Sequence, residues 1–385
     1  MAGAGAATPR RCVVAGAGVL GVCLAARLAG AGAEVTLLDQ DQPGRAATRS
    51  SFAWLNSNDK APRAYHDLNL AGVRAWEELA GTLDGPAWYR PAGNLEWAAS
   101  APGRAELAAR VRRLTEWGYP ARLISAAEAA DLEPSLRLPR PGPNVAWFPG
   151  EGYLLTEAMI SDLLARAVGH GTRVLTGAPG QVTGLGTRGG GWAVRTAAGR
   201  EIHADVVVCC AGTRVPELAA LAGASCPVPL VSWAEPGAPA PGLVVQAGPV
   251  AGRGLTRMVH APEVYLRPHT GGLVHLEAPD AAVDLHTPGA ELRRWAGELL
   301  DRARRVTGGL DDAAVTGYRV CVRPMPADGQ SIVGWLPGVS GVYVAVTHSG
   351  VTLGAHLAGL ITAELLGGAA PAELAPFRPG RFLVG

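Results

Sequence analysis

The sequence predicts an α/β fold in which a parallel-sheet domain is interleaved with an α+β domain built on a mixed or antiparallel sheet. Residues 11–39 have the pattern of a strand, a glycine-rich turn, a helix and a second strand. Residues 331–366 return to α/β character, and residues 228–320 mix short strands with one long helix. A chain of 385 residues is too long for one ordinary core, which favours two domains.

The segment RCVVAGAGVLGVCLAARLAGAGAEVTLLD, residues 11–39, has the spacing of a Rossmann-like dinucleotide-binding unit. Gly16 would make the tight turn, Gly18 would let the backbone approach a pyrophosphate, and Gly21 would let the helix pack against the sheet. The helix N-terminus would face the phosphates. Asp39 would bond the ribose hydroxyls and repel a 2′-phosphate, so FAD or NAD is expected and NADP is disfavoured.

A secretory signal peptide is the alternative interpretation of this region, because Arg10 and Arg11 precede an apolar run at residues 12–26. Cleavage there would remove the first strand of the sheet. It would also leave the apolar residues of the second strand, Val35, Leu37 and Leu38, without a role. We therefore expect the dinucleotide-binding unit.

Further elements are expected in order along the chain. The polar loop at residues 40–59 is too long for a simple connection, so it would either line a cofactor or be a solvated surface loop. A helix follows at 64–80, and Ser125 with Glu128 forms a capping box before a short helix. Helices are also expected at 154–168, 215–221, 290–306 and 351–366, and strands at 173–176, 182–185, 205–210, 264–266, 273–276, 331–333 and 342–346.

These patterns assign residues 1–82, 147–227 and 321–385 to the nucleotide-binding domain. Residues 83–146 and 228–320 are assigned to the substrate-binding domain. No internal repeat is evident in either part.

Composition excludes several classes of function. The 34 basic and 33 acidic residues leave a net charge of +1, so no overall field favours nucleic acid or an anionic membrane. No segment offers the roughly 18 uninterrupted apolar residues of a transmembrane helix, and a cytoplasmic location is expected. The six cysteines lack the spacing of a zinc site and the density of a disulfide scaffold. Partners are therefore expected to be small molecules.

The chain resembles the flavin-dependent amine and amino-acid oxidoreductases of the D-amino-acid oxidase superfamily, which includes glycine oxidase and monomeric sarcosine oxidase. Four blocks carry the resemblance: the unit at 11–39, the serine-containing loop at 48–56, the segment ADVVVCCAG ending at Gly212, and the tail RPMPADGQSIVG followed by GVYVAVTHSGVTLGAHLAGLI. Their order and spacing agree with the family, and they span nearly the whole chain.

The resemblance implies FAD, held noncovalently. The serine loop would lie beside the isoalloxazine, and the helix N-terminus in the tail would meet the flavin pyrimidine edge, where its positive end stabilises the reduced anion. The residues expected to bind the cofactor are Gly16, Gly18, Gly21, Asp39, Gln40, Ser50, Ser51, Val182, Gly212, Gly350, Val351, Thr352 and Leu353.

Three residues are candidates for the catalytic site. In glycine and D-amino-acid oxidases an arginine in the matching Arg-Pro dipeptide binds the substrate carboxylate, and the resemblance gives this role to Arg323. A guanidinium suits it because it offers a planar bidentate fork; the alternative is a structural salt bridge. His348 would either act near the flavin or pack against backbone, and Tyr265 would either line the pocket or pack in the core.

Two features depart from sarcosine-oxidase-like members. Where those members carry a lysine that promotes reaction with oxygen, the segment GGLVHL places Val274, and Lys60 is the only lysine of this chain. Cys321, seven residues before Asp328, resembles the cysteine that tethers flavin in sarcosine oxidases, and a small apolar strand residue is the alternative. The electron acceptor, O2 or another molecule, therefore stays open.

The function that the resemblance implies is oxidation of a C–N bond in an amino acid or secondary amine. Hydride would pass from the α-carbon to flavin N5, and the imine would hydrolyse. The protein would supply orientation and electrostatics, so no dedicated general base is expected. The alternatives are flavin-dependent dehydrogenation or cyclisation of an amine-containing biosynthetic intermediate, a non-catalytic flavin-binding protein, and an NAD enzyme, which would be colourless.

Overall fold

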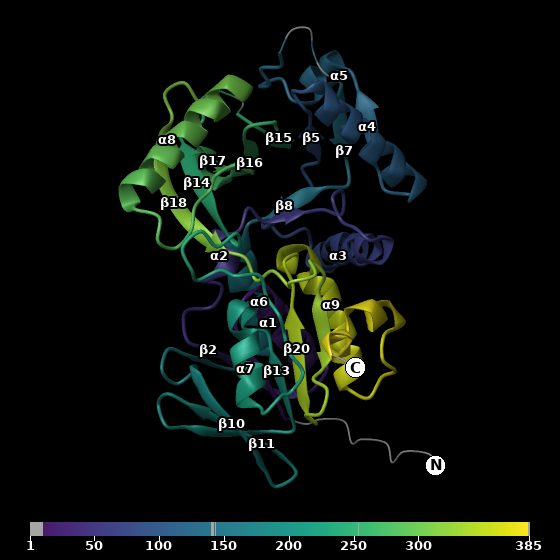
Figure 1. Ribbon diagram of the computed structural model, residues 1–385, viewed down its shortest axis with the longest axis vertical. Coiled ribbons are helices and arrows are strands. Elements are labelled where there is room, and N and C mark those ends of the chain that lie inside the picture. The colour runs from purple at the N-terminus through teal and green to yellow at the C-terminus, as the bar shows by residue number, and fades with distance from the viewer. Residues whose placement is uncertain (1–10, 140–141, 143, 253, 384–385) are drawn as a thin grey trace.

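The computed structural model of the chain describes residues 11–139, 142, 144–252 and 254–383. Two large β-sheets organise it, and a small three-stranded sheet lies between them (Figure 1). The six-stranded sheet with its helices forms the lower part of the view, and the eight-stranded sheet forms the upper part. The predicted fold class, a Rossmann-like α/β part beside an α+β part on a mixed sheet, is confirmed.

The six-stranded sheet consists of β1 (Arg11–Ala15), β2 (Glu34–Asp39), β9 (Arg173–Thr176), β13 (Val206–Cys209), β19 (Ile332–Trp335) and β20 (Val342–Val346). Its order is β19-β20-β13-β1-β2-β9, and only the edge strand β19 runs antiparallel to its neighbour. The carboxyl ends of the parallel strands therefore lie at one edge, where open α/β sheets bind their ligands.

Helices cover one face of this sheet, and a small sheet with one short helix covers the other. Because strand side chains alternate, Val14 of β1 packs in the core under the long helices and Val13 packs in the core on the opposite face. The long helices are α1 (Val19–Gly30), α3 (Arg63–Thr82), α6 (Thr156–Gly169) and α9 (Gly350–Leu365). The opposite face carries α7 (Val215–Leu221) and the strands β10 (Val182–Arg188), β11 (Gly191–Thr196) and β12 (Glu201–Ala204).

The eight-stranded sheet has the order β18-β14-β17-β16-β15-β5-β7-β6. Its strands are β5 (Asn94–Glu96), β6 (Arg122–Ile124), β7 (Val145–Phe148), β14 (Pro241–Gly248), β15 (Met258–His260), β16 (Tyr265–His269), β17 (Leu273–Glu277) and β18 (Ala314–Val322). One face is apolar: Leu266 and Leu276 pack with Leu299 of α8 (Gly289–Val306). Helices α4 (Ala101–Glu116) and α5 (Ala126–Leu132) lie at its β6–β7 end.

The second half of the loop at residues 40–59 is part of the interior, whereas most of residues 40–46 are exposed. It contains α2 (Ala47–Ser50) and β3 (Trp54–Leu55), and residues 55–58 are buried. Strand β3 pairs with β8 (Gly152–Leu154), which pairs with β4 (Tyr89–Arg90). The interpretation as a solvated surface loop is therefore wrong for residues 52–58, which are largely buried.

Most expected elements are present, and several strands that were not expected, among them β3, β5, β7 and β8, are present as well. The capping box forms with both of its hydrogen bonds, from Glu128 N–H to Ser125 Oγ and from Ser125 N–H to the Glu128 carboxylate. The paired strands β14 and β18 were not anticipated. The apolar run at 12–26 forms β1 and part of α1, whereas Arg10 lies outside the described residues. The boundaries of the two domains stay a prediction.

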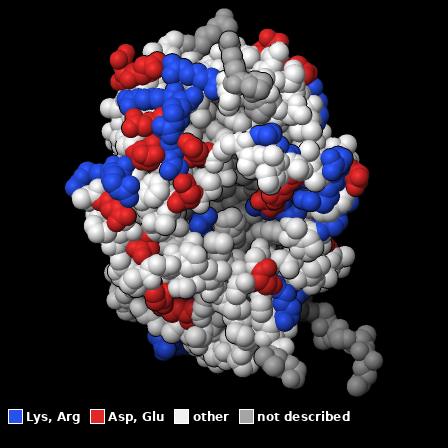
Figure 2. All heavy atoms as spheres, turned by 45° about the horizontal axis from the view of Figure 1, so that its top comes forward, with Lys and Arg blue, Asp and Glu red and all other residues white. Residues whose placement is uncertain are grey.

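Charged side chains of both signs intermix on the face shown in Figure 2, whose centre is hollowed. Helix α8 contributes several ion pairs, including Arg304 with Asp301 and Arg305 with Glu263. Among the helices that the structure describes, none combines the length and the apolar character that a membrane span requires.

Candidate active site

Two glycines, one in the turn after β1 and one in α1, lie where the protein backbone leaves no room for a side chain. Gly16 has φ of 108°, and a Cβ atom there would lie 2.6 Å from the carbonyl carbon of Cys210. A Cβ atom on Gly21 would lie 1.8 Å from the carbonyl oxygen of Gly16, so α1 can pack this closely only with glycine. Gly18 caps α1 without a side-chain hydrogen bond. Within the described residues, the N–H groups of Gly18, Leu20 and Gly21 have no hydrogen-bond partner.

Asp39 stands at the end of β2, beside this turn. Its carboxylate accepts hydrogen bonds from the N–H groups of Ala17 at 2.6 Å and Asp41 at 2.8 Å. Burial raises the pKa of Asp39, and these two N–H groups oppose the rise. The next residue, Gln40, accepts a hydrogen bond from Arg214, so a cation that the sequence analysis did not single out lies near Asp39.

Helix α2 touches both the glycine turn and the eight-stranded sheet. Thr48 Oγ1 accepts a hydrogen bond from Val19 N–H in the first turn of α1, at 3.0 Å. Ser50 ends α2, and Ser51 Oγ accepts a hydrogen bond from Ala53 N–H at 2.9 Å. On the other side, the thiol of Cys321 lies 3.7 Å from the carbonyl oxygen of Ala47. Burial raises the pKa of Cys321 to about 12, which disfavours the thiolate.

The N-terminus of α9 is uncapped. Among the described residues, the N–H groups of Gly350, Val351 and Thr352 have no partner, and Leu353 N–H bonds the carbonyl oxygen of Ser349. Trp76 Nε1 of α3 donates to the carbonyl oxygen of Val351 at 2.7 Å.

The side chain of Thr352 holds this end of α9 against β3, because its hydroxyl donates to the carbonyl oxygen of Trp54 at 3.1 Å. The two remaining residues expected to bind the cofactor lie elsewhere. Gly212 has φ of 57° and begins the 3₁₀ turn Gly212–Arg214 after β13, whereas Val182 is buried in the core at the start of β10. The glycine turn, Asp39 and Gly212 thus share the carboxyl edge of the parallel sheet. Val182 follows two residues after Gly180, where a Cβ atom would lie 2.3 Å from the carbonyl oxygen of Asp39.

One face of the eight-stranded sheet carries a row of ionisable side chains. Strand register places Glu277, Tyr265, His260 and Glu96 next to one another on β17, β16, β15 and β5. Their chain neighbours Leu276, Leu266, Val259 and Leu95 point into the apolar core on the opposite face. Alternation along the strands therefore separates this row from the core.

Aromatic contacts connect this row to the loop beside α9. The ring of His260 lies 4.1 Å from that of Trp54 and 4.3 Å from that of Tyr265, between centroids. His260 Nδ1 lies 2.7 Å from Asn94 Oδ1, and burial lowers the pKa of His260 to about 3, so the ring is neutral. Tyr265 is half-buried, and burial raises its pKa to about 12.

Arg323 follows β18 directly and is half-buried. Its Nε donates to the carbonyl oxygen of Ala240 at 2.8 Å, and its Nη2 donates to those of Pro239 and Pro241 at 3.2 and 3.3 Å. No described acid forms an ion pair with it, and its Nη1 has no partner among the described atoms. The guanidinium is thus fixed by backbone and keeps one N–H₂ group free, rather than forming the structural salt bridge.

His348 precedes α9 and keeps solvent exposure although protein surrounds it closely. Burial lowers the pKa of His348 to about 3, and the nearby charges of Lys60 and Arg323 lower it further. Arg323 also opposes the rise that burial causes in the pKa of Glu277. Arg323 therefore lies close to both the ionisable row and the residue before α9.

Glu151 is a buried acid that the sequence analysis missed. It is 1% exposed and accepts three hydrogen bonds, from Tyr119 Oη and Trp54 Nε1 at 2.8 Å and from Asn94 Nδ2 at 3.0 Å. Burial raises the pKa of Glu151 to about 8. Its network supports both Trp54 and the Asn94–His260 pair.

We expect stability to fall as pH rises from about 5 to about 8, because the folded protein holds a proton on Glu151 that the unfolded chain releases. The Glu151→Gln variant mimics the protonated acid: its amide oxygen accepts from Trp54 and Asn94, and its N–H₂ group donates to Tyr119. Chemical denaturation measures the free energy of unfolding at pH 6 and at pH 8. This free energy should be lower at pH 8 by a few kcal/mol, at about 1.4 kcal/mol per pKa unit, only in the unmodified protein. Parallel losses in both proteins would contradict this assignment.

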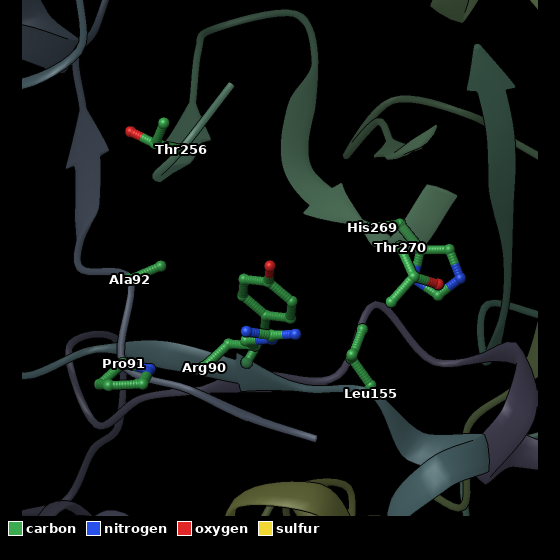
Figure 3. A pocket seen from close by; sticks show the side chains of 8 residues that line it. Arg90, Pro91, Ala92, Leu155, Thr256, His269 and Thr270 are labelled. Atoms are coloured by element: carbon green, nitrogen blue, oxygen red, sulfur yellow. The ribbon is translucent and has the colours of Figure 1, made fainter. Parts of the chain in front are cut away.

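Arg267, next on the same face of β16, is 1% exposed and has no ion-pair partner among the described acids. It donates to the carbonyl oxygen of Phe52 and to His275 Nδ1 at 2.8 Å, and burial lowers its pKa to about 10. A pocket of about 290 Å³ opens nearby between β8 and β16, with Arg90 and His269 in its lining (Figure 3). It contains none of the expected site residues.

The comparisons with known proteins agree with this geometry. A family model described as FAD dependent oxidoreductase (DAO) matches residues 11–365, so the chain belongs to this family of FAD-dependent oxidoreductases. It is 28% identical over 387 residues to the uncharacterized oxidoreductase YurR of Bacillus subtilis, covering 95% of this chain and 98% of that protein.

A second relative is longer than this chain. The tRNA 5-methylaminomethyl-2-thiouridine biosynthesis bifunctional protein MnmC of Ralstonia nicotianae is 30% identical over 424 residues, which cover 97% of this chain and 60% of that protein. This chain thus spans about 60% of that relative's length.

Solved structures share the fold. Glycine oxidase from Geobacillus kaustophilus superposes with a TM-score of 0.81 at 20% identity, covering 98% of this chain and 99% of that one. Iminodiacetate oxidase from a Chelativorans species gives 0.79 at 22% identity, covering 96% and 99%. The resemblance to the D-amino-acid oxidase superfamily and the expectation of FAD are confirmed.

Proposed function

We propose that the protein oxidises a C–N bond of an amino acid or a secondary amine with FAD as its cofactor. The observation that carries this proposal is the position of Arg323. It directly follows β18 of the eight-stranded sheet, and its charge affects the pKa of Glu277 in the ionisable row and of His348 before α9, which supports a position between the substrate-side sheet and the expected flavin end. Its free Nη1 group suits a carboxylate held there.

The described residues fit FAD. The unpartnered N–H groups of Gly18, Leu20 and Gly21 at α1 would hold the pyrophosphate, since a helix N-terminus binds anions. Asp39 would hold the ribose, and the uncapped first turn of α9 would meet the flavin pyrimidine edge. Bound FAD supplies the two-electron acceptor for the reaction.

The chain's own residues would orient the substrate. Arg323 would bind the carboxylate, Tyr265 would contact the substrate from β16, and neutral His348 would lie before α9 without adding charge. Trp54 packs against His260 and so joins the loop beside α9 to the eight-stranded sheet, which would limit the entry of water there. The loss of two electrons from the substrate would give an imine, which hydrolyses to an oxo product and ammonia or a smaller amine.

The test is a steady-state screen of the FAD-loaded protein with glycine, sarcosine, D- and L-amino acids and cyclic imino acids. The proposal expects an oxo product and ammonia, or a smaller amine, from at least one member. Peroxide formation in air would identify O2 as the electron acceptor, whereas turnover only with an added dye would identify a dehydrogenase. A protein that binds FAD but yields no oxo product from any of these compounds would contradict the proposal.

A further inference from the structure

Glu277 is a carboxylate on the substrate side of the eight-stranded sheet. It ends β17, and its cross-strand neighbours are Tyr265 on β16 and Val244 on β14. Val274 and Leu276 of the same strand are buried in the core beneath α8. By alternation, the side chain of Glu277 therefore lies on the same face as Tyr265, turned away from that core.

Glu277 differs in its hydrogen bonding from other acids of this part of the chain. Glu96 is paired with Arg110, Glu151 accepts three hydrogen bonds, and Glu133 accepts hydrogen bonds from Thr256. For Glu277, no hydrogen bond or ion pair is present among the described residues. A half-buried carboxylate without a partner can accept hydrogen bonds, which points to a ligand that donates hydrogen bonds and carries positive charge.

The groups around Glu277 fix what that ligand can be. Tyr265, Cys321 and Arg323 are the titratable groups that interact with it, and the pKa of both Tyr265 and Cys321 is raised to about 12. The first two are therefore neutral near pH 7, and Arg323 is charged. A carboxylate and a guanidinium within electrostatic reach of each other match the two charged ends of an amino-acid zwitterion.

We propose that Glu277 binds the ammonium group of the substrate and accepts one of its protons before the α-carbon is oxidised. This inference rests on the proposed function. In this step an N–H bond of the ammonium breaks, an O–H bond forms on Glu277, and the nitrogen regains its lone pair. The α-C–H bond then breaks with transfer of its two electrons to FAD, and the lone pair forms the C=N bond.

Burial raises the pKa of Glu277, which supports the same role. A carboxylate of raised pKa holds a proton more readily than an ordinary surface glutamate, and so it is a better base.

The Glu277→Gln variant tests the proposal through the pH dependence of anaerobic flavin reduction by an amino acid that the unmodified protein oxidises. Removing the base should slow reduction near pH 7 by ~10²–10⁴-fold. The rate of the variant should then rise about tenfold per pH unit toward the amine pKa of the substrate, because only free amine reacts. Glu277→Asp keeps a carboxylate and should keep the pH profile of the unmodified protein at a reduced rate.

Two further measurements separate this role from a structural one. A carboxylic acid without an amino group, detected by its perturbation of the flavin spectrum, should bind to Glu277→Gln as tightly as to the unmodified protein. The control is Glu263→Gln. Glu263 is exposed and forms an ion pair with Arg305, so this variant should change neither the rate of flavin reduction nor the binding of the amine-free acid.

An unchanged pH profile in Glu277→Gln, or loss of binding of the amine-free acid, would overturn the role of Glu277. If no amine or amino acid reduces the unmodified protein, the proposed function itself fails. These two failures are therefore distinguishable.

Discussion

Replacing Gly21 by alanine is expected to abolish FAD binding and to lower the unfolding temperature. The added Cβ atom would lie 1.8 Å from the carbonyl oxygen of Gly16 and 3.5 Å from a methyl group of Val14. The nearest atom is backbone in the turn itself, so α1 must move away from the sheet. That movement displaces the N–H groups of the first turn from the pyrophosphate position, and overpacking of this kind costs about 1–3 kcal/mol. Flavin absorbance after FAD addition and calorimetry measure the two effects.

The control is Gly81→Ala, near the exposed end of α3. Nothing lies within 4 Å of a Cβ atom there, and Gly81 does not have a positive φ. Alanine favours a helix over glycine by up to about 1 kcal/mol, so this variant should bind FAD and be slightly more stable. Retention of FAD by Gly21→Ala would contradict the assignment of the glycine turn.

Replacing Arg323 by alanine is expected to lower kcat/KM for amino acids by about 10²- to 10³-fold, since a desolvated charge-assisted pair contributes ~3–4 kcal/mol. FAD content should not change, because Arg323 is not among the residues expected to hold the cofactor. Arg323→Lys keeps the charge but loses the planar fork, so its kcat/KM should be intermediate. Steady-state kinetics on the three proteins measure the effect.

An amine without a carboxylate provides the internal control for Arg323. Its oxidation should change little in Arg323→Ala, whereas Arg305→Ala on α8 should leave both kinds of substrate unaffected, because Arg305 pairs with Glu263. Equal losses for substrates with and without a carboxylate would show that Arg323 acts on structure rather than on the carboxylate.

The sequence predicts those features that depend on neighbouring residues. The unit at 11–39 follows from glycine spacing and apolar runs, and the structure forms β1, α1 and β2 there. The capping box of Ser125 and Glu128 also depends on residues three positions apart. Helices α8 and α9 begin and end within one residue of the predicted limits, since their apolar periodicity is continuous.

Features that depend on strand pairing were not predictable in this way. Strands β14 and β18 pair although about 70 residues separate them, and neither carries a strong local pattern. Glu277 was missed for the same reason, because its proposed role depends on strand pairing and on the face of β17 that it occupies. A signal was present: Val274 and Leu276 are the apolar alternates of β17, so His275 and Glu277 must face the other side. In this strand the sequence analysis considered only Val274, which stands where sarcosine-oxidase-like members carry a lysine. The side chain of Val274 lies in the core.

Anaerobic titration of the FAD-loaded protein with the amino acids and amines of the screen tests the central claim most directly. The account predicts that at least one of them bleaches the oxidised flavin spectrum stoichiometrically and that an imine-derived oxo product appears in equal amount. A protein that binds FAD but whose spectrum is bleached only by a compound without an amine nitrogen would contradict the claim. A protein that never acquires a flavin spectrum after FAD addition would contradict the claim that FAD is its cofactor.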